Sequence, residues 1–557
     1  MCLLGGIFMN GLLVLLLALI ALAGAFFGYG KYLEKTWGID PKATTPAYQK
    51  EDGQDYVPTS KWVVFAHQFS SIAGAGPVTG PVIALMFGWL PALLWVIVGG
   101  IFFGAVHDFG ALYASVKNEG KSMGLIIEQY IGKTGKKMFL IFCWLFTLIV
   151  IAAFTDIVAG TFDGIDATGA VNTINGTTAS ISMLFIVVAI LFGLFIRYKK
   201  PNQGVQLVIG IILLIAMIAV GIAFPICIDR SFWIYIIIAY LFLASILPMW
   251  LLMQPRDYLT TFLLVGMIAG AVVGVFVSNP TMNLPAFTGF EVNGKFIFPT
   301  LFVTIACGAV SGFHSLVSSG TSSKQIANEK DMRLVGYGAM LLESLLAVLV
   351  IVIVSSLATG GKLPEGTPFQ LFSTGVSGLL GKLGVPSHVA TCLMAMSVSA
   401  LALTSLDSVA RIGRMSLQEL CDNGGNEKGL AKIFKNKYAA TIITLFFGYV
   451  LALGGYTNIW PLFGASNQLL SALVLISLSV FLKTTGRKGF MLWIPMCIML
   501  VVTMTSLGQS IYAIIVAWQT TGSIDLLTQG LQLFFAVLLV VLGLIVAFSN
   551  FKKLKEA

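Results

Sequence analysis

The sequence has few charged residues. Asp, Glu, Lys and Arg make up only 10% of its 557 residues, against 57% hydrophobic residues, and the mean hydropathy is +0.92. A soluble domain needs far more charge to cover its surface. The composition therefore excludes a soluble module, and the net charge of +9 is to be interpreted loop by loop rather than as a sign of nucleic-acid binding.

Motifs for metals, nucleotides and covalent catalysis are also missing. The seven cysteines stand singly without a CxxC pair, and the four histidines form no Cys/His cluster. This pattern predicts neither a disulfide framework nor a dedicated metal site. There is no phosphate-binding glycine loop, GxSxG elbow or HExxH helix. We therefore expect no cofactor and no enzyme, and transport would draw on an ion gradient rather than ATP.

Long apolar runs recur from end to end, and each is long enough to cross a bilayer. They predict one all-α polytopic membrane domain over 1–557 with about fifteen spanning helices. The expected spans are 3–28, 62–87, 89–116, 138–160, 180–197, 204–224, 232–253, 258–277, 299–318, 335–357, 388–410, 438–453, 462–482, 489–517 and 529–549.

Positive charge is distributed unevenly over the loops between these spans. With fifteen spans, one side receives all but four of the 33 Lys and Arg residues, the exceptions being Arg230, Lys295, Lys362 and Lys382. Positively charged loops stay in the cytoplasm. We therefore expect an external N-terminus and a cytoplasmic C-terminus with a short tail at 552–557.

The second expected span is interrupted. The segment Phe65–Pro81 carries Gly74, Gly76, Gly80, Pro77 and Pro81 inside an apolar run. Glycine permits unusual backbone angles and proline removes an amide donor, so the helix should break here. A broken helix in a membrane points to the binding site of a secondary transporter, although a kinked packing helix is the alternative.

A second break is expected in the seventh span, where Pro248 and Pro255 interrupt 244–258. Two broken helices, five spans apart and opposite in direction, are typical of an inverted five-plus-five repeat. We thus predict a leucine-transporter-like core over 62–410, with peripheral helices at 1–30 and 438–549.

Several polar groups fall inside the expected spans, where they default to functional roles. His67, His107 and Asp108 suit proton coupling, or a structural hydrogen-bonded pair. Adjacent residues such as His107 and Asp108 point in different directions on a helix. Seven hydroxyls and His314 crowd Ser311–Ser323, which suits a sodium ion or a polar substrate, or packing between helices.

Two further charged sites have simpler interpretations. Asp407 lies four residues before Arg411, so a helix-surface ion pair is expected, with coupling as the alternative. Arg256 and Asp257 follow the second expected break and are predicted to be a loop pair at the membrane surface. An arginine that meets a substrate carboxylate is the alternative.

The chain resembles the carbon starvation protein A family of transporters, as a short member. The resemblance rests on Thr45-Pro-Ala, Asp52-Gly-Gln-Asp-Tyr-Val-Pro58, Ile72–Pro77, Gly104–Phe109, Gln254–Leu259, Thr304–Thr321, Tyr337–Glu343 and Trp460–Gln468. It implies uptake of peptides or pyruvate, proton symport for the pyruvate members, and kinship with the amino acid–polyamine–organocation superfamily. The family usually has Gly-His-His-Phe at Ala66–Phe69 and Gln at His107, so a histidine differs in position.

We therefore expect a multi-pass inner-membrane transporter that imports a short peptide or pyruvate, with protons as the coupling ion and sodium as the alternative. The expected partners are this small molecule and the bilayer. The residues expected to bind substrate are His67, Gln68, Ser70, Ser71, Gly74, Ala75, Gly76, Pro248, Trp250, Gln254, Ser311, His314 and Ser315. Those expected in coupling are His67, His107, Asp108, Ser318, Ser319 and Asp407. A sodium-coupled amino-acid or carboxylate transporter, a channel and a membrane enzyme are the alternatives. An ion shared by His67, Gln68, His107 and Asp108 also stays open.

Overall fold

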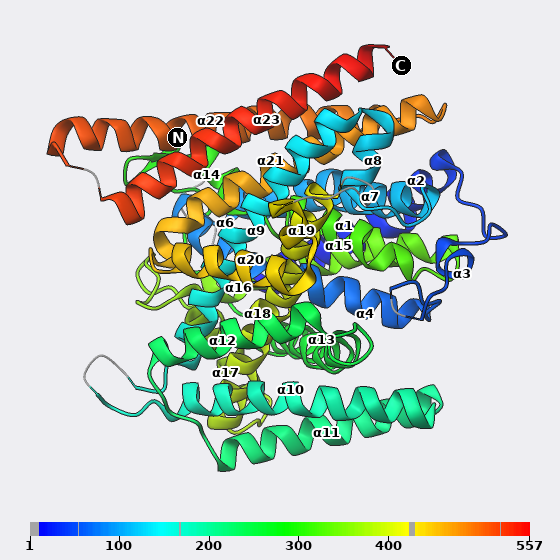
Figure 1. Ribbon diagram of the computed structural model, residues 1–557. Helices are drawn as coiled ribbons and strands as arrows, with labels where there is room; N and C mark the ends of the chain where they lie inside the picture. Colours follow the sequence, from blue (N-terminus) through cyan, green and yellow to red (C-terminus); the bar gives the residue numbers. More distant parts are fainter. Residues whose placement is uncertain (1–9, 54, 166–168, 423–428, 524, 557) are drawn as a thin grey trace.

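The computed structural model describes residues 10–53, 55–165, 169–422, 429–523 and 525–556. Helices make up most of this described chain (Figure 1). The long apolar runs dictate this result, because a helix satisfies its own backbone hydrogen bonds where no water is present. Within the described residues the strands are limited to one small hairpin, β1 (Glu291–Val292) with β2 (Lys295–Phe296).

Thirteen α-helices, some of them joined in pairs, contribute to the eleven candidate membrane spans of the described residues. They are α1 (Gly11–Gly24), α2 (Gly30–Trp37), α6 (Trp89–Gly99), α7 (Ala105–Lys117), α9 (Lys133–Phe162), α10 (Thr173–Lys199), α11 (Gln203–Ala223), α13 (Met253–Ser278), α16 (Ala339–Ser356), α18 (Ser387–Leu420), α21 (Tyr456–Thr484), α22 (Phe490–Thr521) and α23 (Leu531–Glu556). The helix pairs α1 with α2 and α6 with α7 each form one continuous span.

The remaining helices are shorter. They are α3 (Pro46–Gln49), α4 (Lys61–Ile72), α5 (Gly76–Ala84), α8 (Met123–Tyr130), α12 (Arg230–Ile246), α14 (Ile297–Thr304), α15 (Gly312–Gly320), α17 (Pro368–Lys382), α19 (Leu430–Lys435) and α20 (Lys437–Ala452). The described residues contain eleven candidate membrane spans, or twelve if the bent pair α4 and α5 is one span. The chain is thus a multi-pass membrane protein.

The expected count of fifteen spans remains a prediction. Its four further members fall on α4 with α5, on the short apolar helices α12 and α20, and on α14 with α15. The apolar piece expected at 369–380 is α17. The first expected span begins outside the described residues, and α1 starts at Gly11.

Helix α21 lies in the interior, although the sequence placed it at the periphery. Every residue from Leu462 to Leu482 is buried inside the molecule. It packs against α9, α15, α22 and α23. Polar contacts hold it there in addition to apolar packing. Asn467 forms a hydrogen bond with the segment between α14 and α15, and Gln468 forms one with α14.

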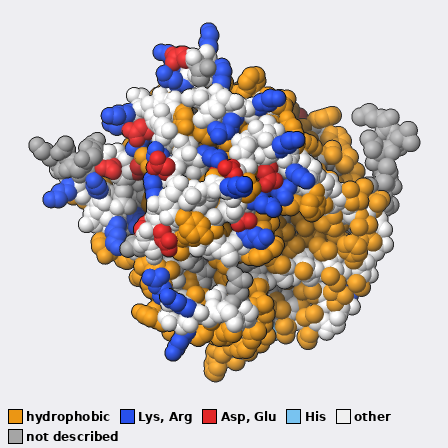
Figure 2. Space-filling view, turned by 90° about the vertical axis from the view of Figure 1, so that its right-hand side faces the viewer, with side chains coloured by type: hydrophobic (Ala, Val, Ile, Leu, Met, Phe, Trp, Pro, Cys, Tyr) orange, Lys and Arg blue, Asp and Glu red, His pale blue; other side chains and the backbone are white. Residues whose placement is uncertain are grey.

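The surface divides into charged and apolar regions. Figure 2 views the end of the molecule at which α2, α3 and α8 lie in Figure 1, and Lys, Arg, Asp and Glu gather there. Apolar side chains dominate its right and lower flanks in that view. Helices α10 and α11 form an outer layer in Figure 1, and only 17% of the apolar stretch of α11 is buried. Its exposed residues are suited to lipid.

Candidate functional site

Two helices are broken in the middle of the bundle. The first ends as α4 at Ile72 and resumes as α5 at Gly76, with a bend of 44°. Pro77 lies in the first turn of α5, where its missing amide hydrogen has no cost. The second ends as α14 at Thr304 and resumes as α15 at Gly312. Between them Gly308 has a φ of +86°, which glycine adopts without strain.

The two breaks touch each other. A Cβ atom at Gly76 would collide with the Cβ and Sγ atoms of Cys307, and one at Gly80 would collide with the carbonyl oxygen of Thr304. A Cβ at Gly74 would lie 2.6 Å from the Oγ of Ser405 on α18. The glycines of the first broken helix therefore permit close contact with the second broken helix and with α18.

Replacing Gly76 with alanine tests this contact. We expect Gly76→Ala to cost about 1–3 kcal/mol, because the added methyl group overfills a packed contact. The thermal unfolding midpoint of the purified protein measures this loss. Gly266→Ala on α13 is the matched control, because a Cβ there meets no atom within 4 Å. Equal midpoints for the two variants would contradict the close contact.

The second break differs from the one expected at 244–258. Helix α12 ends at Ile246, and Pro255 lies in the first turn of α13. Pro248 follows the end of α12, so both prolines mark a connection between two helices rather than a break within one. The ninth expected span, 299–318, is the one that is interrupted.

A buried polar network joins α4 to α13 and to the end of α15. His67 Nδ1 lies 2.8 Å from the carboxylate of Asp257, and its Nε2 lies 3.1 Å from the hydroxyl of Thr321. Arg256 donates to Asp257 at 2.7 Å. The side chains of His67, Arg256 and Asp257 are at most 2% exposed. The surface loop pair expected for Arg256 and Asp257 is therefore wrong.

Asp407 belongs to the same network. It forms an ion pair with Arg256 and accepts a hydrogen bond of 2.5 Å from Tyr240, which also accepts from Arg256 at 2.7 Å. Arg411 instead donates to the carbonyl oxygens of Ala244 and Leu247. The expected pair of Asp407 with Arg411 is wrong because both side chains reach α12 and its C-terminal end, which the sequence spacing cannot reveal.

The remaining polar residues of α4 connect it to α15 and α18. Gln68 donates to Ser318 at 2.9 Å and accepts from Ser322 at 2.6 Å. Thr404 donates to the carbonyl oxygen of Ser70, and Ser408 donates to the hydroxyl of Ser71. Gln68, Ser70 and Ser71, all expected at the site, thus lie on the buried surface beside the first break.

A second cluster links α7, α15 and α16. Asp108 on α7 lies 2.8 Å from His107 through one carboxylate oxygen and 2.8 Å from His314 through the other. The Nε2 atom of His314 lies 3.4 Å from Glu343 on α16, and the amide of Gly308 donates to Glu343. The expectation that His107 and Asp108 point apart is therefore only half right, because they contact each other while Asp108 also reaches α15.

The hydroxyls of α15 have mostly local partners. Ser315 donates to the carbonyl of Gly312, and Ser319 donates to that of Ser315. Ser311 bonds to Asn467 of α21 at 3.2 Å. Ser318 meets Gln68, as described above. The structure brings these residues together along α15, and Ser311 lies in the second break.

Pro248, Trp250 and Gln254 lie apart from the crossing of the breaks. Trp250 stacks under Arg197 of α10, with 5.3 Å from the guanidinium carbon to the ring centre. Gln254 donates to Gln325 at 3.2 Å. Pro248 is exposed after the end of α12. The structure therefore does not bring these three together with Gly74, Ala75 and Gly76.

A cavity of about 410 Å³ lies where α9 ends and where α10 and α12 begin. Thr79 of α5, Gln370 of α17 and Val398 of α18 also line it. Arg230 forms an ion pair with Asp156 at this cavity. Asp229, just before Arg230, caps α12 by accepting from the amide of Ser231, and these hydrogen bonds lower the pKa of Asp229. The cavity size suits a small organic molecule.

Sequence reasoning missed several members of these clusters. Asp257 was predicted only as a loop partner of Arg256, and Glu343, Tyr240, Thr321 and Cys307 were not among the expected site residues. Their partners lie far away in sequence, and no spacing rule connects them. The usable signal was general, since an ionisable residue in an apolar run needs a buried partner.

The fold and the crossed breaks define the class, a multi-pass membrane protein with a leucine-transporter-like fold. A manganese transporter from Eremococcus coleocola matches with a TM-score of 0.50 at 12% identity, covering 90% of this chain and 99% of that chain. The structure of MhsT in complex with L-phenylalanine matches with a TM-score of 0.51 at 14% identity, covering 81% and 99%. At such identities these likenesses show the fold alone.

The chain belongs to the carbon starvation protein CstA family, whose model matches residues 10–365 and 361–506. It is 32% identical to the pyruvate/proton symporter BtsT of Escherichia coli, over 88% of this chain and 80% of that protein. It is 33% identical to the peptide transporter CstA of Helicobacter pylori, over 82% and 75%, and 31% identical to the peptide transporter CstA of Bacillus subtilis, over 87% of both.

Proposed function

We propose that this protein is a secondary transporter that imports pyruvate or short peptides across the cell membrane together with protons, and that it is not an enzyme. The observation that carries the proposal is the contact of two broken helices at Gly76 and Cys307, together with a buried histidine–carboxylate pair that joins His67, on the first of these helices, to Asp257 of α13. The names of the relatives supply the substrate classes and the proton.

The substrate carboxylate would bind at the first break. The segment Ala73–Ala75 leads into the N-terminus of α5, whose backbone amides and helix dipole favour a negative charge. Cys307 and Ser311 of the second break face this region from the other side. We place the substrate between Gly74, Ala75, Gly76 and Ser311, with Gln68, Ser70 and Ser71 below it on α4.

Helix packing supports an inverted repeat with different members from those expected. The proposed first half is α4–α5, α6–α7, α9, α12 and α13, and the second is α14–α15, α16, α18, α20 and α21. Equivalent pairs are in contact in both halves. The pairs are α4 with α13 and α14 with α21, α5 with α16 and α15 with α7, and α12 with α18 and α20 with α9. The α10–α11 hairpin would then be an insertion, and the core would extend to α21.

His67 and Asp257 are the proposed proton-coupling pair. An imidazole gains and loses a proton in the physiological pH range. His67 joins α4 to both α13 and the end of α15, so its charge would affect how these helices pack. Asp407 takes part through Arg256. A coupling role for His107 and Asp108 stays a prediction from the sequence.

Sodium coupling is the second candidate, with an amino acid or another carboxylate as substrate. Ser318 and Ser319 would then be ligands of the ion. Ser318 accepts a hydrogen bond from Gln68 of α4, and Ser319 donates one to the carbonyl oxygen of Ser315 within α15. The external N-terminus and the cytoplasmic C-terminus are part of the proposal and follow from the loop charges. The inner-membrane location is also part of it and is based on the relatives.

Uptake by proteoliposomes tests the function. We expect labelled pyruvate or a labelled dipeptide to accumulate above equilibrium when an inward proton gradient is imposed without sodium. A protonophore should abolish the accumulation. Uptake that needs sodium at fixed pH would show that sodium, and not the proton, is the coupling ion. Flux that never exceeds equilibrium would indicate a channel and contradict the proposal.

A further inference from the structure

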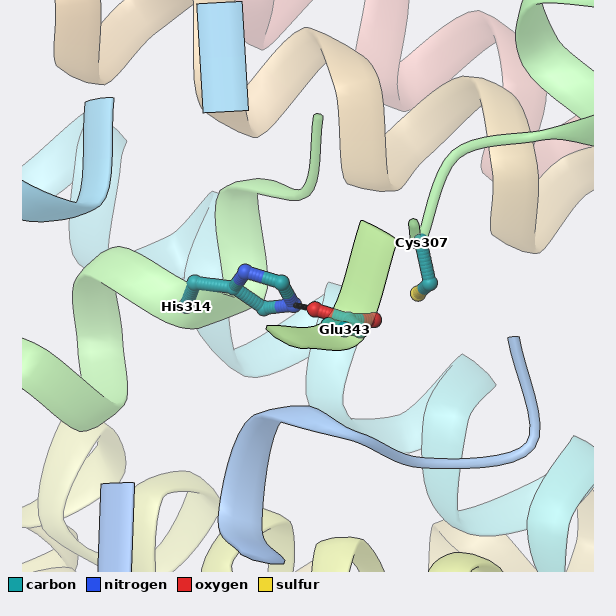
Figure 3. A group of neighbouring side chains, drawn as sticks. All are labelled: Cys307, His314 and Glu343. Carbon is teal, nitrogen blue, oxygen red and sulfur yellow. Dashed lines mark ion pairs between the residues drawn. The ribbon is translucent and has the colours of Figure 1, made fainter. Parts of the chain in front are cut away.

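Three potential metal ligands converge at the second break. Cys307 lies in the non-helical segment, His314 on α15 and Glu343 on α16, and their donor atoms all lie within 4.8 Å of one another. In Figure 3 the imidazole and the thiol both turn toward the carboxylate of Glu343. Cys307 is 5% exposed, and the other two are fully buried.

Two of these donor atoms have no hydrogen-bond partner in the described part of the chain. They are His314 Nε2 and Glu343 Oε2, which face each other at 3.4 Å. A buried polar atom without a hydrogen bond is costly, and here two of them face each other across an ion pair too long for a hydrogen bond. Tetrahedral zinc with bonds of about 2.0–2.3 Å holds its ligand atoms about 3.3–3.8 Å apart, so this spacing fits an ion between them.

The surroundings of the three ligands match a metal site as well. Asp108 accepts from His314 Nδ1 at 2.8 Å, which leaves Nε2 as the ligand atom, an arrangement common for metal-bound histidine. The backbone amide of Gly308 donates a hydrogen bond to the other carboxylate oxygen of Glu343. Asn467 donates one to the sulphur of Cys307 at 3.6 Å. A divalent ion with one thiolate and one carboxylate carries no net charge, which suits the membrane interior.

We propose that Cys307, His314 and Glu343 bind a divalent transition metal ion, with zinc as the best fit. Sulphur and imidazole ligands favour zinc over magnesium or calcium. Three protein ligands leave one position of a tetrahedral ion open. This position takes a carboxylate or keto oxygen of the transported substrate, an assignment that rests on the proposed function.

Metal content measured on the intact purified chain tests the site. We expect about one zinc ion per chain after dialysis against metal-free buffer, and none in Cys307→Ala. Asp108→Asn should weaken zinc binding about 10–100-fold, because Asp108 only orients a ligand. Cys143→Ala is the matched control, since Cys143 is also buried but lies on α9, outside the cluster.

Cobalt gives a second readout that does not depend on transport. Co²⁺ added to the chelated protein should produce a sulphur-to-metal absorption band in the near ultraviolet, present in Cys143→Ala and absent in Cys307→Ala. A folded wild-type protein that binds neither zinc nor cobalt would overturn the proposal. So would a folded Cys307→Ala variant that retains both.

Pyruvate tests the open position. Its addition should change the spectrum of the cobalt-loaded protein, and zinc should restore uptake to chelated proteoliposomes. Full proton-driven uptake by the chelated protein would overturn the metal's role in substrate binding while leaving the transport function intact. Absence of uptake under every condition, with zinc still bound, would instead contradict the proposed function.

Discussion

Replacing Arg256 with methionine is expected to destabilise the folded protein by about 3–5 kcal/mol. The guanidinium of Arg256 is 2% exposed and pairs with both Asp257 and Asp407. Its removal leaves Asp407 buried without a cation and Asp257 with His67 alone. The thermal unfolding midpoint in detergent and the amount of folded protein in the membrane measure the effect.

Arg230→Met is the matched control for this variant. Arg230 also pairs with an aspartate, but its side chain is 44% exposed and only Asp156, at 4%, is buried. We expect the loss of this half-exposed pair to cost less than the loss of the fully buried one. Adding Asp257→Asn and Asp407→Asn to Arg256→Met should recover much of the lost stability, because the uncompensated charges are gone. Equal midpoints for the two arginine variants would show that the buried network does not hold the fold.

The second large effect concerns coupling. In His67→Gln, proton-driven accumulation of substrate is expected to fall to the equilibrium level, while exchange of internal for external substrate continues. Glutamine can keep hydrogen bonds to Asp257 and Thr321 but cannot carry a proton at physiological pH. Concentrative uptake and counterflow, measured on the same proteoliposomes, separate these two activities.

His388→Gln is the control for coupling, since His388 is exposed near the start of α18 and lies outside both clusters. It should accumulate substrate as the unmodified protein does. If His67→Gln also accumulates substrate against its gradient, His67 does not carry the proton.

The first break could be predicted from sequence because its signal is local. Gly74, Gly76 and Pro77 act on the backbone where they stand, whatever surrounds them. The second break lacked such a signal. Its segment 305–311 holds a single glycine and no proline, and the hydroxyls after it were interpreted as a helix end. The prolines at 248 and 255 were the stronger local signal, but they mark a connection between helices.

The partners of the polar residues could not be predicted. His67 pairs with Asp257, which lies 190 residues away, and Asp108 pairs with His314, 206 residues away. Only the packing of α4 on α13 and of α7 on α15 brings them together. Spacing on one helix predicted an ion pair of Asp407 with Arg411. In the structure the partner of Asp407 is Arg256, which is distant in the sequence. Cys307, His314 and Glu343 follow no known ligand spacing for the same reason.

The positions of the cavity and of the His67 network have a consequence for the transport cycle. The cavity lies beyond one end of the broken helices, whereas Gln68 and His67 tie α4 to Ser318, Ser322 and Thr321 toward the other end. These hydrogen bonds hold α4 against the end of α15, away from the cavity. Release of the proton from His67 and separation of α4 from α15 would then be a single event. The same hydrogen bonds would determine how strictly substrate transport is coupled to proton transport. They would also determine how many protons cross the membrane when no substrate is bound.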